Sequence, residues 1–204
     1  MGGGKSSSWG GGGGGSAPPI QTADLISLRE SRREEVDQML TVLRDVNNQF
    51  GVQIDTEVGL FPSGSTTMGY YDPNTGNVGI NNSYFNTQKM TTAYDRCVDQ
   101  GFHPPRGNKS AIEAVASHES GHAINYLCAQ KAGMTPEALA NKVVGDSARK
   151  LGYRNSANMA RKISGYAIEN KKEAIAEAFA DVYCNGNKAK KESRAIYDEM
   201  NSYL

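Results

Sequence analysis

Apolar residues recur at helical spacing near the start of the patterned part of the chain, from Thr22 to about Phe50. One face of a helix there would carry Val36, Leu40, Leu43, Val46 and Phe50. Ser31 and Glu34 form a capping-box pattern, so the main helix is expected to begin at Ser31 rather than at Thr22. We predict an N-terminal helix within residues 20–50 that packs on the following domain.

Three short runs between residues 51 and 82 have the composition of β-strands. They cover residues 52–55, 66–71 and 77–81. Turn-forming residues at 72–76 separate the last two runs, so a hairpin is expected there. A short helix over 87–100 and a loop over 101–107, which contains two prolines and two glycines, are expected to follow.

The rest of the chain has helical patterns throughout. Helices are expected over 110–132, from the Thr135 cap and Pro136 onward, over 156–163, over 171–184, and around Ile196, Met200 and Leu204. Strands first and helices later are typical of an α+β fold. We expect a small mixed sheet packed against the first long helix, followed by a mostly helical C-terminal half.

Composition and charge narrow the classes of function. Hydrophobic residues make up 38% of the chain, enough for the core of one domain, which we assign to residues 51–204. The 22 basic and 22 acidic residues cancel, which argues against nucleic-acid binding through bulk positive charge. No apolar run approaches the roughly 18 residues of a membrane span, and the N-terminus lacks an apolar signal core. Neither a transmembrane segment nor a signal peptide is therefore expected.

The N-terminal segment has a biased composition. Its first sixteen residues include nine glycines and four serines, which bury too little apolar surface to offset backbone entropy. We therefore expect residues 1–19 to form a disordered Gly/Ser-rich tail.

The three cysteines indicate a reducing compartment. Cys97, Cys128 and Cys184 contain no CxxC pair, so neither a disulfide framework nor a cysteine zinc knuckle is expected. Export by a non-classical route would leave the same pattern, so both locations stay open.

The predicted helix over 110–132 contains the sequence His118-Glu119-Ser120-Gly121-His122, an HExxH motif. The two imidazoles, four residues apart, lie on the same helix face and can reach one ion. Zinc accepts neutral imidazole readily, and Glu119 is placed to take the proton of a water that the metal activates. This motif predicts a site for one zinc ion.

A working site needs a third protein ligand. The metzincin extension would require Gly at 125 and His at 128, but the chain has Asn125 and Cys128, which excludes that class. Glu173, Glu177 and Asp181 instead lie four residues apart in an otherwise apolar helical pattern. We assign Glu173 as the third ligand and Glu177 as the acceptor of a ligand histidine N–H, although the two roles can be exchanged. Asp181 is expected on the surface.

Two further side chains have alternative interpretations. Tyr166, seven residues before Glu173, is suited to hydrogen-bond an oxyanion, and it is equally suited to the core. His103 is interpreted as a loop histidine rather than as a fourth ligand, because a catalytic metal must keep one position for water.

Two segments resemble a known family. His118-Glu119-Ser120-Gly121-His122-Ala123 is similar to an HExGHA signature, and residues 166–179 are similar to the pattern Y-x-x-x-N-x-x-E-x-x-A-E-A-F. Both belong to gluzincin-type zinc endopeptidases related to the catalytic domain of anthrax lethal factor. The resemblance implies a zincin-like fold and particular residue roles. These are zinc ligation by His118, His122 and Glu173, general-base catalysis by Glu119, oxyanion binding by Tyr166, and a Glu177 partner for a ligand histidine.

The family fold also implies a substrate-binding strand. Its members place an edge strand above the HExxH helix, antiparallel to the peptide substrate. The hairpin strand Val78, Gly79, Ile80 and Asn81 is the candidate here, and it would bind the substrate backbone by strand addition.

These observations predict a zinc-dependent endopeptidase with a protein or peptide substrate. Small zincin domains also occur among phage head and minor capsid proteins, whose Gly-rich beginnings resemble this N-terminus. A phage structural or binding protein that keeps the zinc-bound fold without hydrolysis is therefore the alternative, with a phage or host protein as partner. An exported effector is a third possibility. The expected location is cytoplasmic or virion-associated, or outside the cell after non-classical export.

Overall fold

A small mixed sheet forms one part of the structure, a computed structural model that describes residues 19–204. Its strands are β1 (Gln21–Asp24), β2 (Thr56–Leu60), β3 (Gly69–Asp72) and β4 (Asn77–Asn81), in the order β1-β2-β4-β3. β2 pairs with β1 in antiparallel and with β4 in parallel orientation, and β3 pairs antiparallel with β4. The predicted disordered tail lies, apart from Pro19, outside the described residues.

Seven α-helices and three 3-10 turns complete the described part of the chain. The helices are α1 (Arg33–Phe50), α2 (Thr87–Asp99), α3 (Ala111–Lys131), α4 (Pro136–Lys150), α5 (Ser156–Ile163), α6 (Lys171–Asn185) and α7 (Lys191–Asn201). The 3-10 turns are η1 (Leu25–Leu28), η2 (Tyr166–Ile168) and η3 (Gly186–Lys188). The fold is therefore α+β and mostly helical, as expected.

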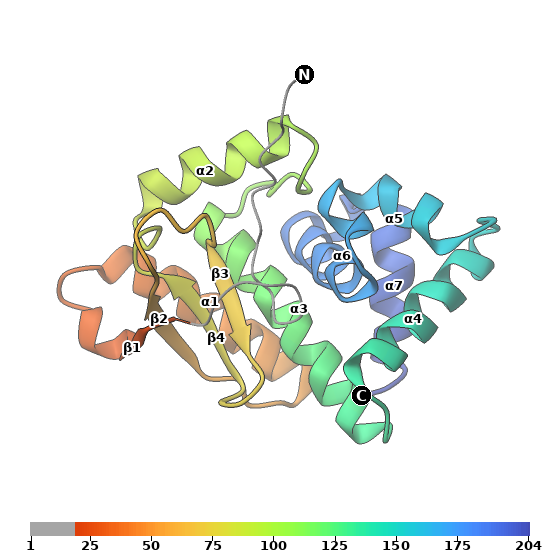
Figure 1. The fold of residues 1–204 in the computed structure, drawn as a ribbon, viewed down its shortest axis with the longest axis horizontal. Coiled ribbons are helices and arrows are strands. Elements are labelled where there is room, and N and C mark those ends of the chain that lie inside the picture. The colour runs from red at the N-terminus through yellow and green to blue at the C-terminus, as the bar shows by residue number, and fades with distance from the viewer. Residues whose placement is uncertain (1–18) are drawn as a thin grey trace.

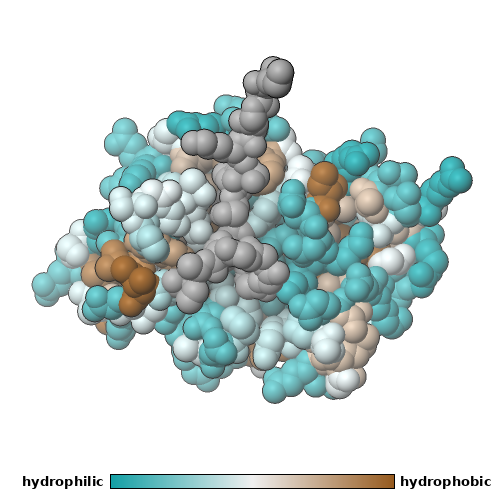
Figure 2. All heavy atoms as spheres, in the orientation of Figure 1, coloured by the Kyte–Doolittle hydropathy of each residue, from teal (hydrophilic) through white to brown (hydrophobic). Residues whose placement is uncertain are grey.

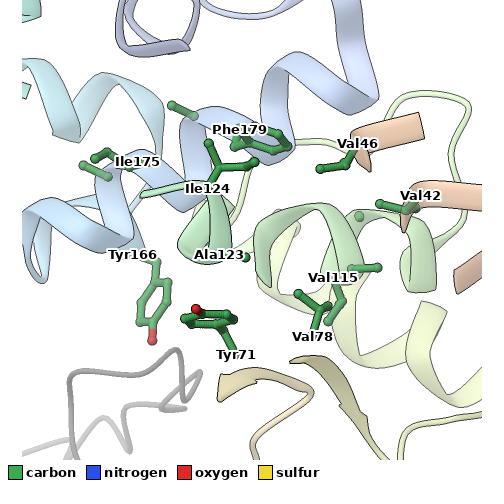
Figure 3. Packing of buried hydrophobic residues seen from close by; sticks show 14 of the residues in the cluster. Val42, Val46, Tyr71, Val78, Val115, Ala123, Ile124, Tyr166, Ile175 and Phe179 are labelled. Atoms are coloured by element: carbon green, nitrogen blue, oxygen red, sulfur yellow. The ribbon is translucent and has the colours of Figure 1, made fainter. Parts of the chain in front are cut away.

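The helix α3 lies between the two halves of the molecule. Figure 1 shows the sheet and α1 on one side of it and α4 to α7 on the other. In Figure 3, Val115 of α3 points toward Val78 of the sheet, and Ile124 points toward Phe179 of α6. Because both halves pack on α3, this helix is buried along most of its length rather than along one stripe.

The start of α3 follows directly from its sequence. The Ser110 hydroxyl accepts a hydrogen bond from the Glu113 amide, and the Glu113 carboxylate accepts one from the Ser110 amide. This capping box satisfies two amides that the first helical turn leaves without partners. It fixes where the helix begins, and with it the direction in which the HExxH side chains point.

The predicted substrate strand is not at an edge of the sheet. β4 contains Val78, Gly79, Ile80 and Asn81, and it is hydrogen-bonded to β2 on one side and to β3 on the other. The hairpin was expected correctly, but the prediction that its second strand is exposed for strand addition is wrong. Parallel pairing with β2 occupies the second side of β4, which leaves β3 as the edge nearer α3.

The N-terminal segment also differs from the prediction. Residues 21–24 form a strand instead of helix, because β2 supplies backbone partners. Ser31 does not cap α1; its hydroxyl donates to the Leu28 carbonyl, and α1 begins after Arg32. The strand predicted over residues 52–55 is wrong, since β2 begins only after it, at Thr56, where the ladders with β1 and β4 run. The strand predicted over 66–71 begins later, at Gly69. The remaining helices form as expected, with Leu204 beyond the end of α7.

The surface is mainly hydrophilic on the face drawn in Figure 2. Within residues 19–204 the exposed large hydrophobic side chains are Ile20, Ile26, Leu60 and Ile168. None of the described helices combines the length and apolar character needed to cross a membrane.

Candidate metal centre

The two histidines of the HExxH motif lie one turn apart on α3 and face the same space. Their ring centroids are 5.0 Å apart, and the two residues are 1% and 4% exposed. One ligand atom from each of His118, Glu119 and His122 lies within 4.8 Å of the other two. The motif therefore forms the compact, buried donor group that its spacing predicts.

Glu173, in the first turn of α6, lies against both histidines. Its Oε2 atom is 3.3 Å from Nε2 of His118 and 3.3 Å from Nε2 of His122. Zinc–ligand bonds of about 2.0–2.1 Å at tetrahedral angles would separate neighbouring ligand atoms by about 3.3 Å. The Glu173 oxygen is thus spaced from both nitrogens as two ligands of one zinc ion are, so these residues fit the ion.

A local cap sets the position of Glu173. The Asn170 side chain accepts hydrogen bonds from the amides of Lys172 and Glu173 and starts α6 at this point. A residue held in the first turn of a capped helix has little freedom to move. The asparagine of the second sequence segment therefore has a physical role in the site.

Gly121 allows α6 to approach α3 closely. A Cβ atom at this position would lie 2.8 Å from Ala176 Cα and 2.9 Å from Phe179 Cβ. These distances are shorter than carbon atoms tolerate, so only glycine permits this packing of the two helices. The approach brings Glu173 to the histidines. A glycine inside an apolar helical pattern was the feature of the sequence that could have indicated this close helix packing.

Glu177 lies one turn further along α6 and contacts the other nitrogen of His118. Its Oε1 atom is 2.8 Å from His118 Nδ1, and the carboxylate is buried. Glu173 approaches Nε2, the nitrogen that faces His122, whereas Glu177 approaches Nδ1. Of the two possible assignments, this geometry favours Glu173 as ligand and Glu177 as the hydrogen-bond partner of His118.

The buried charges in this group perturb one another. Burial alone would raise the pKa of Glu173 and of Glu177, but the neighbouring histidines outweigh burial and lower both pKa values to about 2. Burial opposes protonation of His118, yet its hydrogen bonds to the two glutamates raise its pKa to about 10. Without a metal, the site therefore holds a proton on His118 between two carboxylates.

Glu119 has a different environment. It is 0% exposed, and neither carboxylate oxygen has a hydrogen-bond partner within the described part of the chain. Burial is the main reason that the pKa of Glu119 rises to about 8. A carboxylate with a pKa near neutrality is suited to accept and return a proton.

The edge strand β3 crosses directly over Glu119. A Cβ atom at Gly69 would lie 2.6 Å from Val115 Cγ1 and 2.9 Å from Glu119 Cγ. The strand next to Glu119 is therefore β3, whose glycine allows the contact, and not β4.

Tyr166, in the turn η2, lies beside the histidines. Its ring centroid is 6.0 Å from that of His118, and the residue is 5% exposed. Burial, with the negative charge of Glu173 and Glu119, raises the pKa of the Tyr166 hydroxyl well above its ordinary value. The group remains a hydrogen-bond donor across the physiological range.

Two polar residues, Asp181 and His103, are buried, which their sequence did not lead us to expect. Asp181, expected on the surface, is 2% exposed and accepts hydrogen bonds from the Asn185 side chain and the Lys190 amide. It joins the end of α6 to the start of α7. His103 is in a loop, as expected, but it is 3% exposed, with Nδ1 2.9 Å from Glu177 Oε1. The apolar neighbours Phe102 and Pro104 were the available signal of its burial.

A cavity of about 220 Å³ opens beside His122. It is lined by Tyr71, Pro73, His122, Asn125, Tyr126, Pro136, Glu137 and Lys172. Asn125 donates to the Pro136 carbonyl at 3.3 Å, and its buried Oδ1 atom has no hydrogen-bond partner within residues 19–204. The cavity thus combines aromatic with polar lining residues.

Comparison of the chain with protein-family models, with curated proteins and with solved structures finds no match. The function of the chain is therefore inferred from the chemistry of the candidate metal centre.

Proposed function

We propose that the chain is a zinc-dependent endopeptidase of the gluzincin type with a zincin-like fold. The observation that carries the proposal is the position of Glu173 Oε2, 3.3 Å from Nε2 of both His118 and His122. Residues from two helices converge there with the spacing that tetrahedral zinc requires. Three protein ligands leave one position of the ion open, which is typical of catalytic zinc sites.

His118, His122 and Glu173 would hold one zinc ion, and Glu177 would orient His118 through Nδ1. When bound, zinc polarises a peptide carbonyl and lowers the pKa of water to about 7. Hydrolysis then requires a base near the ligands.

Glu119 is the proposed general base. Its buried carboxylate, one residue from the ligand His118, takes the proton of the attacking water and delivers it to the leaving amine. The same carboxylate thus serves as base and then as acid, and no other proton carrier is needed.

Tyr166 is the proposed partner of the oxyanion. Its hydroxyl keeps its proton because burial raises its pKa. A hydrogen bond from this group would stabilise the negative charge that develops on the carbonyl oxygen in the transition state.

β3 is the proposed docking strand for the substrate. It is an edge strand, and it lies over Glu119 at Gly69. An extended peptide added to its open edge would pass close to the base, with its backbone held by the strand and one side chain in the cavity beside His122.

The isolation of Glu119 favours hydrolysis over a structural role for the site. A metal site with a purely structural role needs its ligands, but it gains nothing from another buried carboxylate that has no hydrogen-bond partner among residues 19–204. Such a group costs stability, and catalysis explains why it is present.

Peptide cleavage by the wild type and by Glu119→Gln tests the proposal. Both proteins, purified and supplied with zinc, are incubated with a mixed peptide library whose products are read by mass spectrometry. We expect internal cleavage by the wild type only, with Glu119→Gln reduced at least ~10³-fold. Equal cleavage by both proteins, or none by a zinc-loaded wild type across the library and denatured protein substrates, would contradict it.

A further inference from the structure

His103 is held by a loop that is fixed from several directions. The Tyr94 hydroxyl donates to the Pro104 carbonyl at 3.0 Å, and its ring stacks on that of His103 at 5.6 Å. The Asn185 side chain donates to the Pro105 carbonyl at 2.7 Å. Contacts from α2 and from the end of α6 therefore hold the loop, and the stacked Tyr94 ring holds the ring of His103.

The same loop is tied to the segment that contains Tyr166. The Gly165 amide donates to the Gly101 carbonyl at 2.8 Å, and the Tyr166 amide donates to the Phe102 carbonyl at 3.1 Å. The rings of His103 and Tyr166 are in edge contact at 5.5 Å. The loop thus adjoins two parts of the candidate centre at once.

His103 shares one carboxylate oxygen with a ligand histidine. Glu177 Oε1 is 2.9 Å from His103 Nδ1 and 2.8 Å from His118 Nδ1, and all three side chains are at most 2% exposed. An ionised carboxylate only accepts hydrogen bonds, so both Nδ1 atoms donate to it. Glu177 Oε2 has no hydrogen-bond partner in the described residues. The orientation of the carboxylate therefore depends on its two imidazole contacts.

We propose that His103 is a positioning residue that holds Glu177 against His118 and so fixes the His118 ring for the metal. The inference rests on the proposed metal site and extends it, because no motif assigns a function to this loop. His103 is a second donor to the Glu177 carboxylate and holds it in place. The carboxylate then keeps the proton on His118 Nδ1, so that Nε2 presents its lone pair to the ion. Outer partners of this kind typically change metal affinity 10- to 100-fold.

Two substitutions of His103 test the hydrogen bond directly. His103→Leu removes the donor, whereas His103→Asn keeps an N–H group close to the position of Nδ1. Zinc dissociation constants are measured by competition with a chromophoric chelator, and the melting temperature of each metal-free protein is recorded. We expect His103→Leu to weaken zinc binding on the order of ten-fold and His103→Asn to recover most of the loss.

Tyr94→Phe is the matched control for damage to the loop. It keeps the ring that stacks on His103 and removes the hydrogen bond to the Pro104 carbonyl. We expect a lower melting temperature with the zinc affinity of the wild type. If Tyr94→Phe weakens zinc binding as much as His103→Leu does, loop stability explains the effect and the positioning role is wrong.

A double-mutant cycle shows whether His103 acts through Glu177. We expect His103→Leu to change zinc affinity little when Glu177→Ala is already present, because no acceptor remains for His103 to orient. A full ten-fold loss in both backgrounds would overturn the proposal, as would wild-type affinity in His103→Leu. If His103→Leu does not fold, His103→Gln, whose amide lies nearer the position of Nε2, replaces it in both comparisons. A wild type that binds no zinc would instead overturn the metal site itself.

Discussion

An alanine at position 121 would place a methyl group where α3 and α6 are in closest contact. Its Cβ atom would lie 2.8 Å from Ala176 Cα, whereas carbon atoms pack best at about 3.5–4.0 Å. Its nearest neighbours would be the Ala176 Cα atom and the Cβ atom of Phe179, neither of which can rotate away. The helices must therefore separate by about 0.7 Å or more.

This separation would disrupt the metal centre more than the fold. Glu173 is on α6, one turn before Ala176, so a shift of about 0.7 Å moves its Oε2 atom well beyond the roughly 0.2 Å that zinc–ligand distances tolerate. Overpacking costs about 1–3 kcal/mol of stability, and the better helix propensity of alanine offsets about 1 kcal/mol. We predict that Gly121→Ala folds but binds zinc at least ten-fold more weakly.

Gly145→Ala is the matched control for this prediction. Gly145 lies in α4, where a Cβ atom would meet only the flexible end of Arg149, at 3.9 Å. This variant should gain up to about 1 kcal/mol of stability and keep the zinc affinity of the wild type. Chelator competition and thermal unfolding are measured for both variants. Wild-type zinc affinity in a folded Gly121→Ala protein would show that this glycine does not bring Glu173 to the histidines.

Three further predictions concern the same site. Tyr166→Phe should keep its zinc and lose about 10²- to 10³-fold in kcat with little change in KM, measured on a peptide from the library. The metal-free protein should be most stable near pH 4.5 in thermal unfolding, because Glu119, whose pKa rises from 4.5 to about 8, costs stability increasingly as pH rises above 4.5. The contribution of Glu173 is lost as pH falls from 4.5 through about 2, and that of His118 is lost as pH rises from 6.5 through about 10. A flat profile would contradict the charge arrangement. Asn125→Leu should keep zinc and shift cleavage toward peptides with larger apolar side chains, because it replaces a polar lining residue of the cavity with an apolar one; an unchanged preference would exclude the cavity from substrate selection.

Local signals explain why most helices were predicted well. Ser110, Thr135 and Asn170 each accept a hydrogen bond from an amide in the first turn of the helix that follows. These caps depend on neighbours in sequence alone. The placement of the two histidines on one face also depends only on helix geometry.

Pairing between distant segments could not be predicted in the same way. The composition of residues 77–81 indicated a strand, but whether β3 or β4 lies at the edge depends on the parallel contact with β2, more than twenty positions earlier in the chain. Residues 21–24 became a strand for a similar reason, since β2 offered an open side. Periodicity within one segment carries no information about its partner.

The surroundings of the site were predictable only in part. The spacing of Glu173 and Glu177 indicated two roles but not which residue has which, because that depends on which imidazole nitrogen each carboxylate reaches. His103, seventy-four residues from Glu177, reaches it only through the folded loop. Asp181 has the same spacing as the two glutamates, yet it caps a helix junction.

The zinc content of the purified protein decides whether His118, His122 and Glu173 form a metal site. Elemental analysis is applied to the wild type, to Glu119→Gln and to Glu173→Ala, after exchange into metal-free buffer and with folding checked by circular dichroism. We predict one zinc ion per chain in the wild type and in Glu119→Gln. We predict strongly reduced zinc in Glu173→Ala, because Glu173 is the proposed ligand and Glu119 is not. Folded wild-type protein that retains no zinc, or full retention in Glu173→Ala, would contradict it.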